Sequence, residues 1–315
     1  GNAANIRHQT SHIILLPSAP IFAILKKFDC MMRRRLHVVL GLALVVMGCS
    51  STRNSSNTPA DFFQYQPGKA AAISAHRGGG DYKGYPENCI ESFAWLAAQM
   101  PVTIECDISM SKDSVLLMMH DDSYNRTTTG SGKISDSLFA YSQTLLLKDN
   151  MGNLTNFGIP TLEQVLAWGR NKVTYTLDIK RSVPFEKVVA LVQQYKAHRY
   201  AAIITYNAQD AAKVHQLDKD VMISVTIRNE DEYNRHKALG IPDNRMIAFV
   251  GTREPNSVWL QTLHSKGIRC ILGTLGNLDK MAAAKSDTLY QSWYKAGADM
   301  MSTDRPLEAW KALQQ

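Results

Sequence analysis

A repeated alternation of short apolar runs with helical patterns constrains the fold of this chain more than any other feature. The apolar runs cover residues 73–76, 102–107, 173–180, 202–206, 221–227, 246–251, 268–273 and 299–303. Helical patterns follow them at residues 87–99, 162–169, 184–198, 208–217, 229–239, 257–266, 278–296 and 306–313. Several runs are apolar on both faces, as expected for strands that helices cover on one side and a closed sheet buries on the other. Eight strand–helix units predict a TIM (β/α)₈ barrel.

A doubly wound parallel sheet is the alternative fold. It would need a glycine-rich fingerprint that opens a helix, with an acidic residue about 20 positions later. The glycines at 78–80 open a loop instead. The barrel therefore remains the better prediction.

One further apolar run, at residues 115–120, cannot be a barrel strand. The apolar pattern of the second strand continues to residue 110, so only residues 111–114 separate the two runs, and a parallel partner would need a crossover of a dozen or more. We expect residues 104–110 and 115–120 to form an antiparallel hairpin at the barrel mouth, which brings His120 back beside Glu105. Residues 121–160 are rich in Thr, Ser, Gly and Asn, and are too long for a plain connection. They predict a small insertion after the second strand, on the face where such barrels keep their active sites.

The segment before the barrel is typical of an exported lipoprotein. Residues 31–35 are a charged n-region, residues 36–47 are an apolar stretch too short to span a bilayer, and Cys49 follows in a setting similar to the bacterial lipobox. An ordinary secretory signal or a buried helix are the alternatives. We predict an upstream segment (1–30) outside the native mature protein, a lipoprotein signal peptide (31–49), a tether (50–70) and the barrel domain (71–315). The expected location is the periplasmic or cell-surface side of a bacterial membrane, with a lipid anchor at Cys49.

The formal net charge of +7 does not indicate a nucleic-acid partner. Residues 1–48 carry six basic residues and one acidic residue, which leaves 29 basic and 27 acidic residues for the rest. A phosphate-backbone footprint is therefore not predicted. The cysteines of the barrel region, Cys89, Cys106 and Cys270, have no spacing typical of a disulfide framework or a metal site.

Chemically active side chains gather at the ends of consecutive strands. The first strand ends in a histidine and an arginine, the second carries two carboxylates on one face, the third carries a carboxylate and a lysine on one face, and the hairpin ends in a histidine. These residues are His76, Arg77, Glu105, Asp107, Asp178, Lys180 and His120.

Each of these residues has a structural explanation when taken alone, such as a satisfied polar histidine, a surface Glu-x-Asp pair or an Asp-x-Lys salt bridge. Their common position at strand ends favours a shared site. Three clustered carboxylates suit a hard divalent cation such as Mg²⁺ or Ca²⁺. An arginine and a lysine suit a phosphate group, and two histidines suit acid–base catalysis near neutral pH.

The chain resembles the glycerophosphodiester phosphodiesterase family, within the phosphatidylinositol-phospholipase-C-like phosphodiesterase superfamily. The resemblance runs from about residue 72 to the C-terminus. It is carried by His76-Arg77-Gly78, Pro86-Glu87-Asn88, Glu105-x-Asp107, His120-Asp121, Arg126-x-Thr128, Pro160-Thr161-Leu162-Glu163, Asp178-x-Lys180 and Thr303-Asp304-x-Pro306.

The resemblance implies a TIM barrel that hydrolyses small glycerophosphodiesters to glycerol 3-phosphate and an alcohol. It implies Ca²⁺ or Mg²⁺ held by Glu105, Asp107 and Asp178, acid–base catalysis by His76 and His120, and a phosphate held by Arg77 and Lys180. Glu87 is expected to support the metal shell or His76, from the opening turn of the first helix.

Other functions remain open at this stage. One is a phospholipase D-like or cyclising phosphodiesterase that acts on intact lipid, although the insertion looks too polar for an apolar rim. Another is a non-catalytic surface binding lipoprotein. A glycosidase barrel would explain neither Arg77 nor Lys180.

The chain departs from the family pattern in three places. Cys89 replaces the usual threonine, Asp178 replaces a glutamate, and residues 271–274 lack the common Trp-Thr-x-Asn. An aromatic wall of the pocket would then come from elsewhere, for example from Tyr206 or Trp293.

Overall fold

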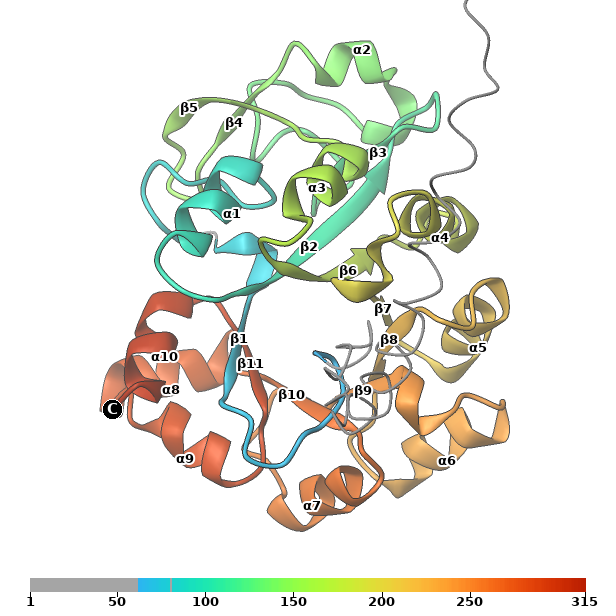
Figure 1. The fold of residues 1–315 in the computed structure, drawn as a ribbon. Coiled ribbons are helices and arrows are strands. Elements are labelled where there is room, and N and C mark those ends of the chain that lie inside the picture. The colour runs from blue at the N-terminus through green and yellow to red at the C-terminus, as the bar shows by residue number, and fades with distance from the viewer. Residues whose placement is uncertain (1–61, 80) are drawn as a thin grey trace, which may run out of the picture. The chain divides into compact units, whose positions relative to one another are not determined.

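The computed structural model describes residues 62–79 and 81–315, and confirms the predicted (β/α)₈ barrel. All eight barrel strands run parallel, and β1 pairs with both β2 and β11, which closes the sheet (Figure 1). The barrel strands are β1 (Ala72–Ala75), β2 (Thr103–Met110), β6 (Thr174–Ile179), β7 (Ala201–Thr205), β8 (Met222–Thr226), β9 (Met246–Phe249), β10 (Arg269–Gly273) and β11 (Met300–Thr303).

Helices surround the closed sheet (Figure 1). They are α1 (Ile90–Ala97), α3 (Leu162–Gly169), α4 (Phe185–Gln194), α5 (Ala208–Leu217), α6 (Glu230–Ala238), α7 (Ser257–Ser265), α8 (Asn277–Lys285), α9 (Leu289–Lys295) and α10 (Pro306–Leu313). Short 3₁₀ turns η1 (His76–Gly78), η2 (Ile134–Asp136), η3 (Ala197–Arg199) and η4 (Asp243–Arg245) lie between them.

Two predicted helices differ from the structure for local reasons. The helix predicted from residue 87 begins at Ile90, because Asn88 has a left-handed φ of 55° and Cys89 is extended. The helix predicted over 278–296 is divided at Ser286, whose extended backbone ends α8 and whose hydroxyl accepts a hydrogen bond from the Thr288 N–H.

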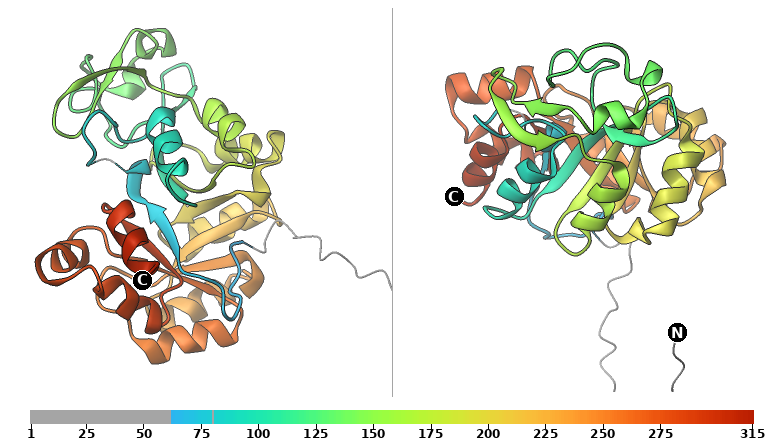
Figure 2. Two further views of the ribbon diagram at one scale, coloured as in Figure 1. Left: turned by 60° about the vertical axis from the view of Figure 1, so that its left-hand side comes forward. Right: turned by 90° about the horizontal axis from the view of Figure 1, so that it is seen from above.

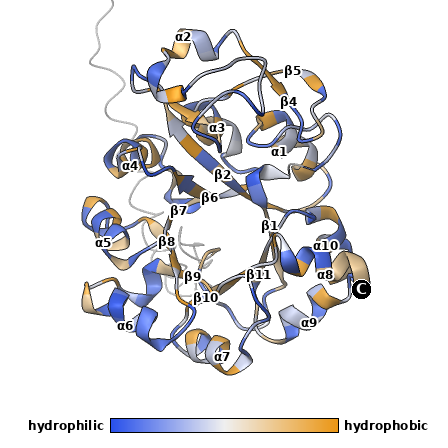
Figure 3. Cartoon of the chain, turned by 180° about the vertical axis from the view of Figure 1, so that it is seen from behind, coloured by the Kyte–Doolittle hydropathy of each residue, from blue (hydrophilic) through white to orange (hydrophobic). Residues whose placement is uncertain are grey.

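The alternation of side chains along each strand divides the core into two layers. Outward residues such as Ile73, Leu177 and Ile223 pack under the helices in one large apolar cluster. Inward residues such as Met222 and Met300 fill the bottom of the barrel. Helix α6 is largely hydrophilic (Figure 3), and most of its residues are exposed, while Glu232, Tyr233 and His236 are buried.

The predicted hairpin is present. β3 (Leu116–Met118) pairs antiparallel with the end of β2, with Ile108 opposite Met118, and the Met119 N–H donates to the Asp107 carbonyl at 3.0 Å. His120 follows directly and interacts electrostatically with Asp107. Continued by two residues, the register of Ile108 opposite Met118 brings His120 level with Cys106, between Glu105 and Asp107 and close to its predicted place beside Glu105.

Residues 121–160 form a small substructure with its own core. It contains η2, α2 (Phe139–Ser142), and the antiparallel pair β4 (Leu146–Lys148) and β5 (Leu154–Gly158). Figures 1 and 2 show it gathered beside α1 and α3. Its apolar cluster includes Tyr124, Leu145 and Leu147, and reaches Cys89 before α1.

The predicted tether is wrong for residues 62–70, which pack against the amino end of the barrel. Phe63 is fully buried in the inner apolar cluster. The buried Arg269 guanidinium donates to the Phe62 carbonyl, and the Tyr65 ring stacks on His264 with centroids 3.8 Å apart. Phe62 and Phe63 were the available sequence signal, because a solvated tether would leave two large apolar side chains exposed to water.

The lipoprotein signal, the lipid anchor at Cys49 and the upstream segment lie outside the described residues. Within the part of the chain that the structure describes, no helix combines the length and the apolar character needed to cross a bilayer.

Substituting Phe63 with alanine tests whether this segment belongs to the barrel. We expect Phe63→Ala to lower the free energy of unfolding by about 3–5 kcal/mol, because it opens a cavity at the barrel bottom. Urea denaturation measures this, with the exposed Val258→Ala as the control. Equal stability of the two variants would show that residues 62–70 contribute no core.

Candidate active site

Three carboxylates meet at the centre of the barrel mouth. Glu105 and Asp107 lie two residues apart on β2, and Asp178 lies on β6 in direct register with Asp107. All three are buried, and one carboxylate oxygen of each lies within 4.8 Å of the others. The structure thus brings together the predicted trio, hereafter the carboxylate trio.

The trio carries more negative charge than its surroundings balance. Burial, with repulsion from Asp107, raises the pKa of Glu105 to about 8, and burial also raises the pKa of Asp178. Burial acts the same way on Asp107, but the Lys180 ammonium, 2.6 Å away, outweighs it and lowers that pKa. Three closely spaced carboxyl groups do not all ionise unless a positive charge lies between them. Such a set of oxygen ligands fits a hard divalent cation.

Two neighbours fix the orientation of the carboxylates. The Asn88 amide donates to Asp107 Oδ2 at 2.8 Å, and its oxygen accepts from the Asp107 N–H at 2.8 Å. The Tyr206 hydroxyl donates to Asp178 Oδ2 at 2.9 Å. The sequence showed Asn88 only as part of the Pro86-Glu87-Asn88 motif, and its role could not be predicted because its partner Asp107 lies 19 positions away.

His76 follows β1 and is oriented by a residue that sequence reasoning did not assign. Its Nδ1 lies 2.6 Å from Asp304 Oδ1. Burial opposes protonation of His76, but the hydrogen bond to Asp304 and the charge of Glu105 outweigh it and raise its pKa. The Asp304 N–H donates to the buried Asp279, which also accepts from the Thr303 hydroxyl. The Thr303-Asp304 motif was the available signal.

Glu87 supports neither His76 nor the trio directly, which corrects the prediction. It is buried before α1, and it accepts hydrogen bonds from Arg77 at 3.1 Å and from both terminal nitrogens of Arg126 at 3.1 and 2.7 Å. Arg126 also binds Asp121, which in turn lies 2.8 Å from His120 Nδ1. Glu87 therefore links the arginine after β1 to the histidine after β3.

Arg77 is held in an unusual conformation. Its φ is 53°, in the left-handed region, and its N–H donates to Glu105 Oε2 at 2.7 Å. Its buried Nε has no hydrogen-bond partner among the described residues and lies 4.0 Å from Asp107. A buried guanidinium nitrogen without a partner is rare, and it leaves a donor available at the site.

The glycines after Arg77 serve the packing of α1. Gly78 has a φ of 74°, and a Cβ there would lie 2.0 Å from the Phe93 ring. A Cβ on Gly79 would lie 2.7 Å from Leu96. These contacts require glycine at both positions.

The departures from the family pattern have distinct outcomes. Tyr206 is exposed at the mouth and lines its cavity. Trp293 instead is buried against Tyr290 and does not line that cavity. Cys89 precedes α1 without capping it, and its thiol donates to Glu91 at 2.9 Å. Burial, with the Glu91 carboxylate beside it, raises the pKa of that thiol to about 12.

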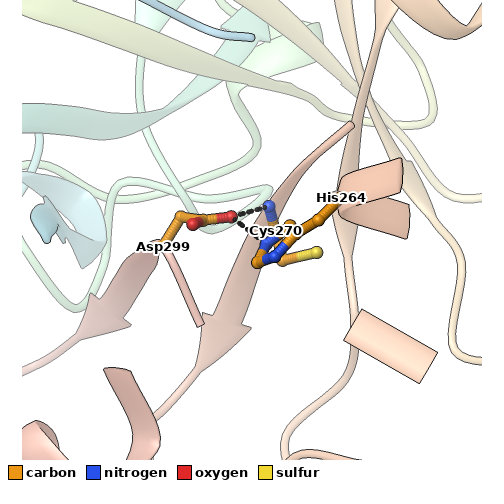
Figure 4. Close-up of side chains that lie close together, drawn as sticks. All are labelled: His264, Cys270 and Asp299. Atoms are coloured by element: carbon orange, nitrogen blue, oxygen red, sulfur yellow. Dashed lines mark hydrogen bonds and ion pairs between the residues drawn. The ribbon is translucent and has the colours of Figure 1, made fainter. Parts of the chain in front are cut away.

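A second group of metal-type ligands lies near the amino end of the barrel. His264 Nε2 lies 2.8 Å from Asp299 Oδ2, which also accepts from the Cys270 N–H at 2.7 Å (Figure 4). Burial raises the pKa of the Cys270 thiol well above its ordinary value, which disfavours the thiolate that a metal needs. These contacts tie α7 to the starts of β10 and β11.

The barrel mouth combines a carboxylate trio that could hold a divalent cation with an arginine, a lysine and two histidines, a set of side chains that fits the hydrolysis of phosphoric diesters. The family model of the glycerophosphoryl diester phosphodiesterase family matches residues 76–257, and the chain belongs to this family.

Solved structures and curated relatives agree with this family. A glycerophosphoryl diester phosphodiesterase from Parabacteroides distasonis is 33% identical, with a TM-score of 0.77 over 81% of this chain and 90% of that one. A glycerophosphodiester phosphodiesterase from Caldanaerobacter subterraneus subsp. tengcongensis is 24% identical over 74% of this chain and 94% of its own length. An Oleispira antarctica phosphodiesterase, in complex with the product sn-glycerol-3-phosphate, shares the fold at 17% identity and a TM-score of 0.61, over 78% of this chain and 98% of that one.

Replacing Asp304 tests whether its carboxylate raises the pKa of His76. The Asp304 carboxylate favours the protonated imidazole, so Asp304→Asn should lower the pKa of His76 and reduce kcat about tenfold or more, as expected for weakened acid–base catalysis. An NMR titration of the His76 ring and a kcat profile against pH measure this. Asp287→Asn, which removes a partner of Arg305 instead, is the control. An unmoved His76 titration in Asp304→Asn would contradict the assignment.

Proposed function

We propose that this enzyme hydrolyses small glycerophosphodiesters to glycerol 3-phosphate and an alcohol, with Ca²⁺ or Mg²⁺ at the carboxylate trio and acid–base catalysis by His76 and His120. The observation that carries the proposal is the trio itself, with one oxygen of each residue within 4.8 Å of the others. Its position beside Arg77, Lys180 and two carboxylate-paired histidines supports phosphoryl chemistry.

Glu105, Asp107 and Asp178 would hold the cation. When bound, it neutralises charge that develops on the phosphate oxygens. Lys180, now paired with Asp107 and Asp178, would then be released to the phosphate. The unpartnered Arg77 Nε is a second donor for the same group.

His76 and His120 have matching arrangements. Each imidazole places Nδ1 against an aspartate, Asp304 for His76 and Asp121 for His120. This pairing leaves Nε2 of each ring for proton transfer. One histidine takes the proton of the nucleophile, and the other protonates the leaving alcohol. The nucleophile is water, or the neighbouring glycerol hydroxyl through a cyclic phosphate.

A phosphodiesterase acting on intact lipid is the second candidate. The sequence indicated a polar insertion, but Leu138, Tyr141, Met151 and Leu154 are exposed large apolar residues within it. Leu138 and Tyr141 lie just before and on α2, and Met151 and Leu154 lie at the turn from β4 to β5. Exposed apolar residues of this kind can contact a membrane. Turnover of glycerophosphodiesters against intact phospholipids, compared in Ca²⁺ and Mg²⁺, separates the two candidates.

We also propose that the chain is an exported lipoprotein anchored through Cys49. The charged, apolar and cysteine-containing segments at 31–49 support this. Detergent phase partitioning of the full chain expressed in bacteria tests it, and Cys49→Ala should move the protein to the aqueous phase.

The histidine assignment predicts a large loss of turnover. His76→Ala and His120→Ala should each reduce kcat by about 10²-fold or more, the usual scale for general acid–base catalysis. His198→Gln, which removes a histidine paired with Asp218 away from the site, should not. Steady-state kinetics on glycerophosphocholine measure this. Near-normal turnover in either alanine variant would remove that histidine from the reaction.

The cation assignment predicts sensitivity to chelation. Activity should be lost in excess EDTA and return with Ca²⁺ or Mg²⁺, while Glu105→Gln should bind the cation more weakly in calorimetry. Full activity of metal-free protein would contradict the assignment.

A further inference from the structure

Three buried side-chain atoms lack a hydrogen-bond partner among the described residues, and they are Arg77 Nε, His215 Nδ1 and His236 Nε2. Arg77 belongs to the site already described. His236 lies on α6, and only 3% of its surface is exposed. Its Nδ1 donates to the Glu232 carbonyl at 2.7 Å, so Nε2 carries the lone pair of the neutral ring. Buried polar atoms are normally satisfied, and a nitrogen of this kind indicates that a ligand binds beside it.

His236 lines a cleft of about 220 Å³ between the start of α5 and α6, hereafter the α5–α6 cleft. The two helices are neighbours around the barrel (Figure 1). Tyr206, which follows β7, and Thr226, at the end of β8, line both this cleft and the cavity at the barrel mouth. The cleft therefore opens next to the mouth, on the face of the barrel that holds the carboxylate trio.

Positive charge exceeds negative charge around the α5–α6 cleft. Its charged side chains are two arginines, Arg228 and Arg235, and one carboxylate, Glu232. The guanidinium and the N–H of Arg228 both donate to Glu232, which satisfies that carboxylate. Arg235 lies 4.0 Å from the same carboxylate, and its exposed guanidinium has donors left for a second anion. The nearby Asp210 lines the adjoining cleft toward α4 instead.

The start of α5 adds backbone donors to the same cleft. Ala208 and Gln209 line it in the first turn of this ten-residue helix. N–H groups in a first turn have no partner within the helix, and the positive end of the helix dipole favours an anion. The Asn207 side chain accepts from the Asp210 N–H and leaves those of Ala208 and Gln209. The cleft thus combines backbone N–H groups, a guanidinium and an imidazole nitrogen without a partner.

The imidazole distinguishes between anions. In the neutral ring Nε2 accepts a hydrogen bond, and neither a sulfate nor a carboxylate carries a proton to donate at neutral pH. A phosphomonoester does, because its second ionisation lies at about pH 6. We propose that the α5–α6 cleft binds a phosphomonoester group, with one proton held between a phosphate oxygen and Nε2 of His236. This second site goes beyond the proposed function. The group belongs either to a phosphorylated alcohol on the substrate or to a free phosphate, such as the product.

A binding experiment on the wild-type protein tests the site apart from catalysis. Inorganic phosphate should move the His236 ring signals in an NMR titration, and sulfate at equal concentration should move them less. Arg235→Gln should raise the apparent Kd for phosphate about 3- to 10-fold, the scale of one exposed charge-assisted hydrogen bond. The matched control, Arg170→Gln, removes the same charge after α3, where the guanidinium donates to the Tyr195 carbonyl, and should leave the Kd unchanged.

Kinetics identify the molecule that carries the phosphomonoester, and this comparison rests on the proposed function. If the group belongs to the substrate, kcat/KM for glycerophosphoinositol 4-phosphate should exceed that for glycerophosphoinositol. His236→Asn should then reduce this preference about 3- to 10-fold, because asparagine can keep the hydrogen bond to the Glu232 carbonyl but has no atom in place of Nε2.

The outcomes separate this inference from the proposed function. Equal kcat/KM for the two diesters, together with a moved His236 signal, assigns the cleft to free phosphate. If neither diester is hydrolysed but phosphate still moves the signal, the proposed function fails and the cleft stands. His236 signals that neither inorganic phosphate nor the phosphorylated diester moves would overturn the inference.

Discussion

The parallel pairing of β2 with β6 is the interaction on which the site depends. Its register sets Asp107 against Asp178, so two strands alone assemble the carboxylate trio. Three carboxylates in a buried position are costly unless a cation or proton balances them. The backbone ladder and the apolar layer under the helices hold them together, and Lys180 provides the compensating charge.

The loops above the barrel convert this strand geometry into a complete site. Glu87, from the segment before α1, binds Arg77 and Arg126 together, and Arg126 reaches Asp121 beside His120. One buried carboxylate thus couples the β1 loop to the insertion. The insertion also contacts that loop through Asp149, which accepts from the Gly84 N–H at 2.8 Å. The position of His120 therefore depends on contacts made outside the barrel proper.

The sequence was sufficient for the features that follow from local periodicity. Strands, helices and the tight hairpin follow from apolar alternation and loop length, and strand ends in a parallel barrel converge on one mouth. The chemistry of the trio could be predicted because Glu105, Asp107 and Asp178 needed only strand pairing to meet.

What could not be predicted depends on partners distant in the chain. Asp304 meets His76 across 228 positions, and the burial of Phe63 depends on closure of a barrel that begins nine residues later. Gly78 and Gly79 indicated a flexible turn, but their requirement comes from Phe93 and Leu96 of α1.

The two ends of the barrel differ in a way that bears on substrate access. The amino end is closed by Phe63 and by residues 62–70 as they join β1, whereas the carboxyl end holds the trio, the histidines and the cavity. A tether that precedes residue 62 would therefore attach to the closed end and leave the open end for molecules arriving from solution. A water-soluble diester can enter such a mouth directly, whereas a phospholipid could reach it only if the exposed apolar residues of the insertion brought the mouth to a bilayer.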